Sequence, residues 1–317
     1  MNTYDGDNQV WSVTQGADNA MYFANNHYFL RYNGVKWDKY ILPNKTVIRS
    51  VFADSNRIYC GSYTEFGYWQ RIKGKMIYHS LSKGKNLFTG YSNNEEIWKI
   101  FKFQNKIYFQ SFNELFVYDG VNISKIRIPF QISYCFILNN QIYAASVRQG
   151  VYKFQNQAFI KIEHWNELEN NVVHSIDAYQ GKTFIFTQKK GVFVEENNKL
   201  LPWKNLLNNE LKQDIIITAK FISNNRLAIG TAFRGLYIVD MTTGNFTNIN
   251  RNNSLKNNSV LSIGFDKEND LWLGLDNGIA HVEINSPYSI FSDNTGVLGS
   301  VYSVSFLDQG YLLGSNH

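Results

Sequence analysis

The side chains best suited to binding occupy two recurring kinds of position in this sequence. The first is a short turn after an apolar strand, where a charged or long residue replaces the Asn-Gly or Asp-Gly of a minimal hairpin. These turn residues are Tyr63, Glu65, Arg148, Lys190, Arg234 and Asp276. The second lies near the start of the preceding strand and comprises Trp11, Arg49, Trp98, Tyr134 and His174. Aromatic faces with directional polar groups hold sugars, and arginine forks hold carboxylates or sulfates.

Motifs for catalysis or cofactor binding are sparse. The six histidines give no His-x-x-x-His or His-Glu-x-x-His spacing, and the two cysteines lack zinc-ligand spacing. Neither a Gly-x-Ser-x-Gly motif nor a phosphate-binding glycine loop occurs. We therefore predict no catalytic residue and no cofactor. An enzyme would need two carboxylates in one cleft, and Glu65 with Glu114 or Asp276 is the pair that the turns offer.

One acidic segment, residues 266–270, concentrates the oxygen ligands that calcium prefers. It lacks the loop glycine and the downstream bidentate glutamate of a calcium loop. A type I turn between two strands uses the same residue types for backbone reasons. We therefore predict no metal site.

The elements that must position these residues are repeats. A short apolar strand ending in a small or polar pair returns eight times, and the third residue of each copy is Ala24, Gly61, Gln110, Ala145, Phe186, Gly230, Gly274 or Gly314. The intervals between these anchor residues are 37, 49, 35, 41, 44, 44 and 40. A strand-only period of about 40–50 residues is typical of propeller blades.

Each repeat contains four short β-rich segments separated by Gly, Asn, Asp and Ser, the pattern of an antiparallel meander. Such a sheet cannot cover both of its faces alone, whereas sheets stacked radially around an axis bury one another. The sequence therefore predicts an all-β fold, a seven-bladed β-propeller of four-stranded antiparallel blades over residues 1–300. The expected repeats are 9–45, 46–94, 95–131, 132–171, 172–213, 214–258 and 259–300. Residues 301–317 resemble a partial eighth repeat, either the start of a following propeller or truncated closing strands, so we expect a piece of a longer chain.

Composition agrees with this fold and excludes several classes of function. The chain is 44% hydrophobic and 16% aromatic, which suits half-buried strands. The formal charge of +5 is mild and no basic run stands out, so this segment is not expected to bind nucleic acid. No apolar span of about 20 residues occurs, so no membrane contact by this segment is expected. Cys60 and Cys135 are expected to be small buried side chains, and residues 163–171 a loop.

Blade geometry predicts where the candidate residues meet. The second-to-third turns and the starts of the innermost strands emerge on the same face of a propeller. We therefore expect the turn residues Glu65, Arg148, Lys190 and Arg234 on one rim, with aromatic support from Tyr63 and Trp11. Arg148 and Arg234 together favour an acidic sugar. The alternative is that Trp11, Trp98 and Trp272 pack between blades and that the charged turns are solvated surface.

Several stretches resemble a known family of sensors. These are QVWSV (9–13), MYFANN (21–26), RYNGVKW (31–37), IRSV (48–51), RIYCGSYTEFGYW (57–69) and NDLWLGLDNGI (269–279). They are similar to the two-component-regulator-propeller region of Bacteroidetes, the periplasmic sensor of hybrid two-component and membrane-bound LuxR-type regulators. The second blade resembles the LuxR-type branch in particular. Gln110, Ala145 and Phe186 depart from the family consensus, which has glycine there.

The resemblance implies a non-catalytic periplasmic sensor, the extracytoplasmic part of an inner-membrane regulator of signal transduction and transcription. It implies an oligosaccharide from glycan breakdown as the ligand, and a homodimer formed through the full-length sensor. A histidine kinase or DNA-binding output domain would lie elsewhere in such a protein. Two alternatives remain at this point, a carbohydrate-active propeller enzyme and a scaffold for protein–protein interaction.

Overall fold

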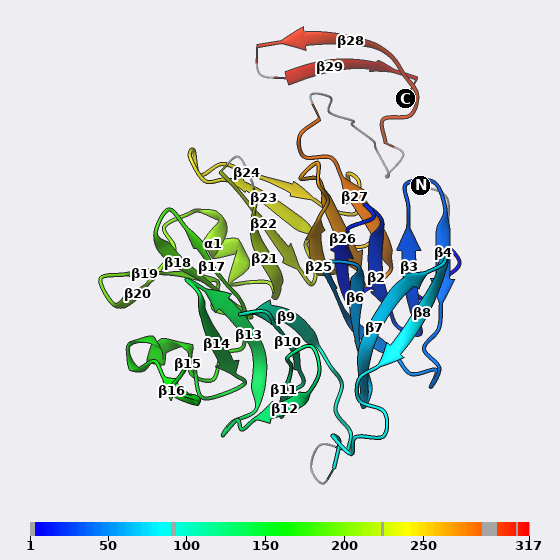
Figure 1. Ribbon diagram of the computed structural model, residues 1–317. Coiled ribbons are helices and arrows are strands. Elements are labelled where there is room, and N and C mark those ends of the chain that lie inside the picture. Colours follow the sequence, from blue (N-terminus) through cyan, green and yellow to red (C-terminus); the bar gives the residue numbers. More distant parts are fainter. Residues whose placement is uncertain (1–3, 90–92, 223–224, 287–296, 309, 317) are drawn as a thin grey trace.

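The computed structural model describes residues 4–89, 93–222, 225–286, 297–308 and 310–316. It shows the expected seven-bladed β-propeller (Figure 1). Six sheets are four-stranded antiparallel meanders in simple chain order. The seventh has three strands among the described residues. Residues 287–296 of the expected last repeat lie outside the described residues.

The first three blades have the following strands. Blade 1 is β1 (Ser12–Gln15), β2 (Met21–Asn25), β3 (Tyr28–Tyr32) and β4 (Trp37–Tyr40). Blade 2 is β5 (Ile48–Asp54), β6 (Arg57–Ser62), β7 (Glu65–Ile72) and β8 (Lys75–Ser80). Blade 3 is β9 (Lys99–Phe103), β10 (Lys106–Gln110), β11 (Leu115–Tyr118) and β12 (Ile123–Ile126).

The remaining blades continue the same order. Blade 4 is β13 (Ile132–Leu138), β14 (Gln141–Ser146), β15 (Val151–Gln155) and β16 (Ala158–Lys161). Blade 5 is β17 (Val173–Tyr179), β18 (Lys182–Thr187), β19 (Val192–Glu196) and β20 (Lys199–Pro202). Blade 6 is β21 (Ile216–Ile222), β22 (Arg226–Thr231), β23 (Leu236–Asp240) and β24 (Phe246–Ile249). Blade 7 is β25 (Val260–Phe265), β26 (Leu271–Leu275) and β27 (Gly278–Val282).

The innermost strands close the ring. Each first strand contacts the first strand of the next blade, and β25 of blade 7 contacts β1 of blade 1. Two backbone hydrogen bonds join the ends at this point: Val10 N donates to Leu275 O at 3.0 Å, and Gly278 N donates to Asn8 O at 2.8 Å. The first strands therefore line the central channel.

Aromatic rings fill the spaces between blades. Phe29 of blade 1 stacks on Trp69 of blade 2, with ring centroids 5.0 Å apart and planes only 6° from parallel. Phe66 of blade 2 stacks on Phe109 of blade 3 at 4.3 Å. Burying a large apolar side chain contributes roughly 1.5–3 kcal/mol, so these rings help to hold blades 1, 2 and 3 together.

The anchor glycines are explained by a hydroxyl on the innermost strand. Ser50 lies opposite Gly61, and its Oγ donates to Ile97 O of blade 3 at 2.7 Å. In the same way Ser262 of blade 7 lies opposite Gly274, and its Oγ donates to Val10 O at 3.3 Å. A Cβ at Gly61 would lie 2.4 Å from Ser50 Oγ, so an alanine cannot take this position without displacing the hydroxyl.

Blade 3 has no glycine at the anchor position, because a different side chain forms the link to the next blade. Lys99, and not a serine, lies opposite Gln110. The buried amide of Gln110 reaches blade 4: Oε1 accepts from Cys135 N at 3.0 Å and Nε2 donates to Ser133 O at 3.2 Å. Gln110 thus replaces the serine hydroxyl as the link between neighbouring inner strands.

Two short helices and one hairpin complete the described chain. The helices are the 3-10 helix η2 (Glu163–Leu168) and α1 (Leu207–Leu211). The loop expected over 163–171 is therefore partly wrong, since burial of Trp165 and Leu168 winds a turn of helix there. Within the described ranges, neither helix is long and apolar enough to cross a membrane.

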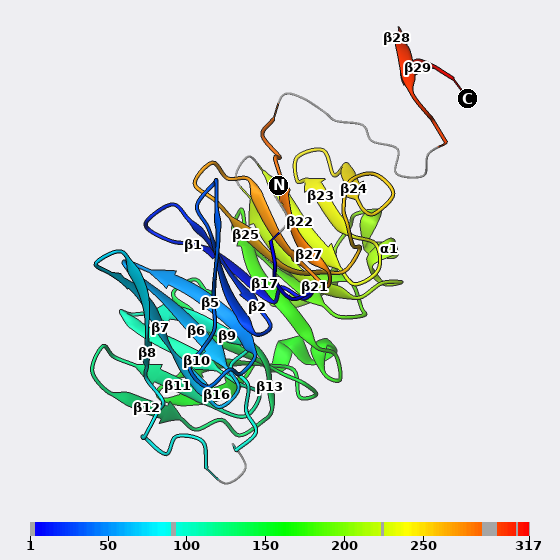
Figure 2. The same cartoon turned by 90° about the vertical axis from the view of Figure 1, so that its right-hand side faces the viewer.

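The hairpin of β28 (Val301–Leu307) and β29 (Gly310–Ser315) repeats the inner pair of a blade, with Ser303 opposite Gly314. It lies apart from the ring in both views (Figure 2). Its large apolar side chains are exposed, Phe306 to 80% and Tyr302 to 74%.

Both cysteines are free and buried, as expected. Burial raises the pKa of the Cys60 thiol and raises that of Cys135 to about 12. Neither thiol is therefore ionised near neutral pH, and the two act as small apolar groups.

Candidate functional site

The starts of the inner strands and the second-to-third turns lie on one face of the ring, as blade topology requires. Trp11 and Trp98 stand directly before β1 and β9, where their amides donate to Ala24 O at 2.9 Å and to Gln110 O at 2.8 Å. Arg49 is an extra residue in β5, between Ile48 and Ser50, where the register shifts. Such a bulge re-aims a side chain, here toward the two tryptophans.

Arg49 lies between two indole rings. Its guanidinium carbon is 4.9 Å from the ring centroid of Trp11 and 4.9 Å from that of Trp98. The two rings meet edge to face, with centroids 5.5 Å apart at 85°. Asn26 Oδ1 accepts from Trp11 Nε1 at 2.9 Å and from Arg49 Nη1 at 3.2 Å. Cation–π contacts and shared hydrogen bonds thus fix the cluster of Trp11, Asn26, Arg49, Glu96 and Trp98, called here the Arg49 cluster.

A carboxylate completes the Arg49 cluster. Arg49 Nε lies 3.1 Å from Glu96 Oε2, and Nη2 lies 3.1 Å from Oε1. The pair is largely shielded, with side chains 16% and 22% exposed. Because both carboxylate oxygens are engaged, Glu96 is oriented as a fixed acceptor beside Trp98.

A cavity of about 370 Å³ opens beside this cluster, at the junction of blades 2 and 3. Its lining residues come from the turns and the links between blades: Tyr63, Asn94, Glu95, Glu96, Trp98, Phe112, Asn113 and Gln131. We call it the blade 2–3 pocket. Trp98 and Phe112 pack at 5.6 Å with their rings tilted by 38°, and Tyr63 donates its hydroxyl to Asn94 Oδ1 at 2.7 Å. Tyr63 and Phe112 remain 37% exposed, so part of each side chain is accessible to a ligand.

Glu95 forms the base of the blade 2–3 pocket. It is only 5% exposed. Its carboxylate accepts from the backbone amide of Asn113 at 3.3 Å and from the side-chain amide of the same residue. Its carbonyl accepts from Thr64 N at 2.8 Å. Glu95 therefore joins the turns of blades 2 and 3 and holds the pocket walls at a fixed spacing.

Tyr134 and His174 form a second pair, on the inner strands of blades 4 and 5. Their ring centroids lie 5.5 Å apart at 45°. Burial lowers the pKa of His174 to about 4, and burial also raises the pKa of Tyr134. A backbone hydrogen bond with Ile217 opposes this lowering of the His174 pKa, and the effect of burial outweighs it.

The predicted turn residue Glu65 is held within its own blade. Glu65 Oε1 accepts from Tyr78 Oη at 2.9 Å and from Ser80 Oγ at 2.7 Å, both on β8. Glu114, its suggested catalytic partner, lies 3.3 Å from Lys125 Nζ of β12. Both carboxylates therefore face outer strands of separate blades.

The predicted turn cations are also separate from the Arg49 cluster. Lys190 Nζ donates to Glu167 O at 3.0 Å, and Arg234 Nη1 lies 3.8 Å from a Glu210 carboxylate oxygen. Arg148 is exposed, and its backbone carbonyl accepts from Asn170 N at 2.8 Å. Each cation belongs to a different blade, 4, 5 or 6.

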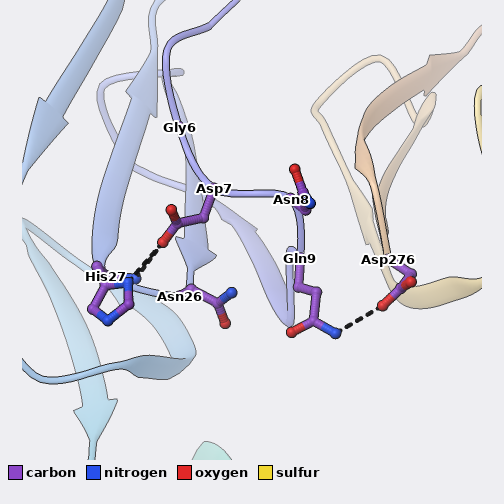
Figure 3. Close-up of a pocket in the computed structure, with 7 residues that line it drawn as sticks. All are labelled: Gly6, Asp7, Asn8, Gln9, Asn26, His27 and Asp276. Atoms are coloured by element: carbon purple, nitrogen blue, oxygen red, sulfur yellow. Dashed lines mark hydrogen bonds and ion pairs between the residues drawn. The ribbon is translucent and has the colours of Figure 1, made fainter.

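Asp276 lines another cavity, of about 380 Å³, where blade 7 meets blade 1 (Figure 3). Gln9 Nε2 donates to Asp276 Oδ1 at 2.8 Å, and the His27 amide donates to Asp7 Oδ2 at 3.1 Å. His27 Nδ1 lies 2.9 Å from the same Asp7 oxygen. Figure 3 shows these two pairs on opposite sides of the N-terminal segment. Apart from Gly6, the residues that line this cavity are polar, and none of them is a Phe, Tyr or Trp.

The acidic segment 266–270 forms a turn whose carboxylates have structural partners. Asp266 accepts from Asp270 N at 2.9 Å and from Trp272 Nε1 at 2.8 Å. Asp270 accepts from Ile284 N at 2.9 Å. These two carboxylates and His281 lie within 4.8 Å of one another, but the hydrogen bonds assign the carboxylates to the turn. Trp272 itself is buried between blades, the packing role considered for it above.

The structure brings four of the predicted residues, Trp11, Arg49, Tyr63 and Trp98, to one corner of the rim. Three further residues at this corner, Glu95, Glu96 and Phe112, were not predicted from the sequence. A signal for the two glutamates exists, because the polar run 93–96 stands directly before an inner strand at the end of the longest interval between anchors.

No family model and no curated protein matches this sequence. Solved structures do. One is named as the extracellular domain of the hybrid two-component system BT3049 from B. thetaiotaomicron. It is 18% identical in sequence and has a TM-score of 0.73, and the match covers 98% of this chain and 45% of that one. Another is named as the extracellular domain of the hybrid two-component system BT4673 from the same organism. It is 19% identical and has a TM-score of 0.71, and the match covers 90% of this chain and 40% of that one.

The present chain therefore spans less than half the length of these two structures. They are of the kind that the sequence resemblance indicates, and at such identities the likeness establishes the propeller fold. A streptogramin B lyase structure shares it too, at 11% identity and TM-score 0.69, covering 90% of this chain and 96% of that one. Since the fold carries both sensors and enzymes, the function has to be argued from the site.

Proposed function

We propose that this chain is a non-catalytic, extracytoplasmic ligand-sensing propeller of a signal-transduction regulator, and that it binds an oligosaccharide in the blade 2–3 pocket. The observation that carries the proposal is the composition of that pocket. Three rings, from Tyr63, Trp98 and Phe112, stand beside side-chain amides and carboxylates in one cavity. Its volume of about 370 Å³ is in the range of small-ligand sites.

This composition suits a sugar for two physical reasons. The C–H faces of a pyranose ring pack on aromatic faces, and Tyr63 and Phe112 offer partly exposed ones. Sugar hydroxyls both donate and accept, so they pair with amides and carboxylates of the kind present on Asn94, Asn113 and Gln131. The Arg49 cluster would keep Trp98 in place before the ligand arrives, which lowers the cost of ordering the site on binding.

The same contacts argue for binding rather than hydrolysis. A glycosidase needs two carboxyl groups free to exchange protons with the substrate. In the pocket, Glu96 is engaged by Arg49 at two points and Glu95 by Asn113 at two points. Both therefore serve as fixed acceptors.

The cellular setting follows the family resemblance. Solved structures that share the fold include extracellular domains of two-component systems, which supports a periplasmic sensor in an inner-membrane regulator. In the full-length protein we expect a kinase or DNA-binding output and a homodimer.

The test is a binding screen with matched aromatic variants. Purified protein is screened against neutral, uronic-acid-containing and sulfated di- to hexasaccharides, and hits are measured by calorimetry. We expect Trp98→Ala and Phe112→Ala each to weaken binding about tenfold or more, the effect of losing 1.4 kcal/mol. Phe233→Ala is the control, because Phe233 is an exposed ring in the equivalent turn of blade 6.

Two outcomes would contradict the proposal. Unchanged affinity in both pocket variants would place the site elsewhere, and a loss in Arg148→Ala and Arg234→Ala would then favour the turn cations. Release of reducing ends from any oligosaccharide, lost in Glu95→Gln or Glu65→Gln, would show an enzyme.

A further inference from the structure

The cavity that Asp276 lines, called here the blade 7–1 cavity, adjoins the Arg49 cluster. Asn26 lines this cavity, and its Oδ1 accepts from Arg49 Nη1 at 3.2 Å (Figure 3). The same guanidinium engages Glu96 through Nε and Nη2, both at 3.1 Å, and Glu96 lines the blade 2–3 pocket. A single side chain therefore separates a wall residue of one cavity from a wall residue of the other.

A buried amide holds one wall of the blade 7–1 cavity in place. Asn25 is fully buried, and its Nδ2 donates to Asp7 O at 2.7 Å and to Gln9 O at 3.0 Å. Its Oδ1 accepts from Asp7 N at 2.7 Å. These hydrogen bonds fix the N-terminal segment against blade 1, so its polar groups are positioned before a ligand arrives, which lowers the cost of binding.

The carboxylates of the blade 7–1 cavity suit sugar hydroxyls. Asp276 accepts from Gln9 Nε2 through Oδ1, and both contacts of Asp7 with His27 use Oδ2. In the described ranges, the second oxygen of each carboxylate has no hydrogen bond, so it can accept from a ligand hydroxyl. Hydrogen bonds to an ionised acceptor are roughly twice as strong as neutral ones.

The charges around the two cavities oppose an acidic ligand. Four carboxylates line them, those of Asp7, Glu95, Glu96 and Asp276. Among the described residues that line either cavity, none is a lysine or an arginine. Arg49, which lies next to both cavities, already donates to Glu96 and to an amide. A sulfate or carboxylate on a ligand would therefore meet like charges here, which costs free energy.

We propose that the binding surface extends from the blade 2–3 pocket across the Arg49 cluster into the blade 7–1 cavity, and that it takes an uncharged oligosaccharide long enough to occupy both cavities. The inference rests on the proposed function, because it requires an oligosaccharide in the blade 2–3 pocket. It differs from the acidic sugar that Arg148 and Arg234 suggested, since those arginines belong to the turns of blades 4 and 6.

Calorimetry with neutral gluco-, galacto- and manno-oligosaccharides of two to six units tests the extension. In at least one series we expect the tetrasaccharide to bind at least tenfold more tightly than the disaccharide. Asp276→Ala and Gln9→Ala should weaken tetrasaccharide binding at least fivefold and leave disaccharide binding unchanged, because the disaccharide occupies the blade 2–3 pocket alone. Asn277→Ala is the control, since Asn277 is the exposed neighbour of Asp276 and does not line the cavity. Circular dichroism confirms that each variant is folded.

A matched pair of probes tests the charge. The neutral tetrasaccharide that binds most tightly is compared with the same molecule after oxidation of its primary hydroxyl groups to carboxylates. We expect the oxidised form to bind at least tenfold more weakly at low salt. The difference should shrink in Asp276→Asn and in higher sodium chloride, because both reduce the repulsion between carboxylates. A lost hydroxyl contact would respond to neither change.

The outcomes separate this inference from the proposed function. If Trp98→Ala weakens both probe lengths while Asp276→Ala and Gln9→Ala weaken neither, the pocket remains the site and the extension is wrong. If Trp98→Ala changes the binding of no probe, the proposed function fails and this inference fails with it. Binding of no neutral probe, or an oxidised form that binds as tightly as the neutral one, would overturn the inference alone.

Discussion

Arg49 and Glu96 join two blades by an ion pair with two hydrogen bonds, Nε to Oε2 and Nη2 to Oε1, both 3.1 Å. The arginine belongs to the inner strand of blade 2, and the glutamate to the segment that leads into blade 3. The same guanidinium lies against Trp11 of blade 1. One side chain therefore connects three blades at the edge of the proposed pocket.

Glu96→Gln should weaken this junction. The change leaves the Arg49 charge between two indole rings without its carboxylate, and we expect a loss of about 1–2 kcal/mol of unfolding free energy. Urea denaturation at pH 7 measures it. Asp54→Asn, which breaks the more exposed pair with Lys102, is the control and should cost no more than about 0.5 kcal/mol. Equal effects of the two changes would contradict a special role for the Arg49 pair.

The Arg49 junction also shows how far the sequence could predict this molecule. The interval between anchors specifies strands and their number, so the seven blades followed from spacing. The direction of individual side chains could not be predicted from this spacing, because the bulge at Arg49 shifts the alternation of β5 by one residue. Spacing also gave no sign that Glu65 would bind Tyr78 and Ser80 of its own blade. Residues on inner strands converge at the axis, whereas turn residues further out diverge.

Gly274→Ala should destabilise the closure of the ring. A Cβ there would lie 2.2 Å from Val10 O and 2.3 Å from Ser262 Oγ, so the backbone of blade 1 would have to move. We expect a loss of roughly 1–3 kcal/mol, the usual cost of overpacking. Gly310→Ala is the control, since nothing lies within 4 Å of its added Cβ. Thermal unfolding of the two variants should separate them clearly, and a wild-type melting temperature for Gly274→Ala would be inconsistent with a tightly closed ring.

His174 should make the fold sensitive to acid. Its pKa is lowered to about 4 in the folded chain by burial, while an unfolded histidine titrates at about 6.5. Between these values the unfolded chain binds more protons, so stability falls as the pH falls from 6.5 to 4, by an amount of order 2–3 kcal/mol. His174→Phe keeps the aromatic contact with Tyr134 and removes the titration. Urea denaturation at pH 7, 5.5 and 4 should show a smaller loss in this variant, and parallel curves for the two proteins would exclude His174 as the cause.

Lys99 should affect stability in the opposite pH range. Burial lowers its folded pKa to about 8, whereas an unfolded lysine titrates at about 10.4. Between these values the unfolded chain again binds more protons, so the stability of the wild-type protein should rise as the pH rises from 8 to about 10.4. At pH 7 the charged lysine opposes folding, and Lys99→Met, measured in chloride without oxyanions, should be more stable by an amount of order 1 kcal/mol. That advantage should disappear above about pH 10.4, where both chains hold a neutral side chain at this position. A Lys99→Met protein that is less stable than wild type at pH 7 would show that the ammonium group is already satisfied within the ring.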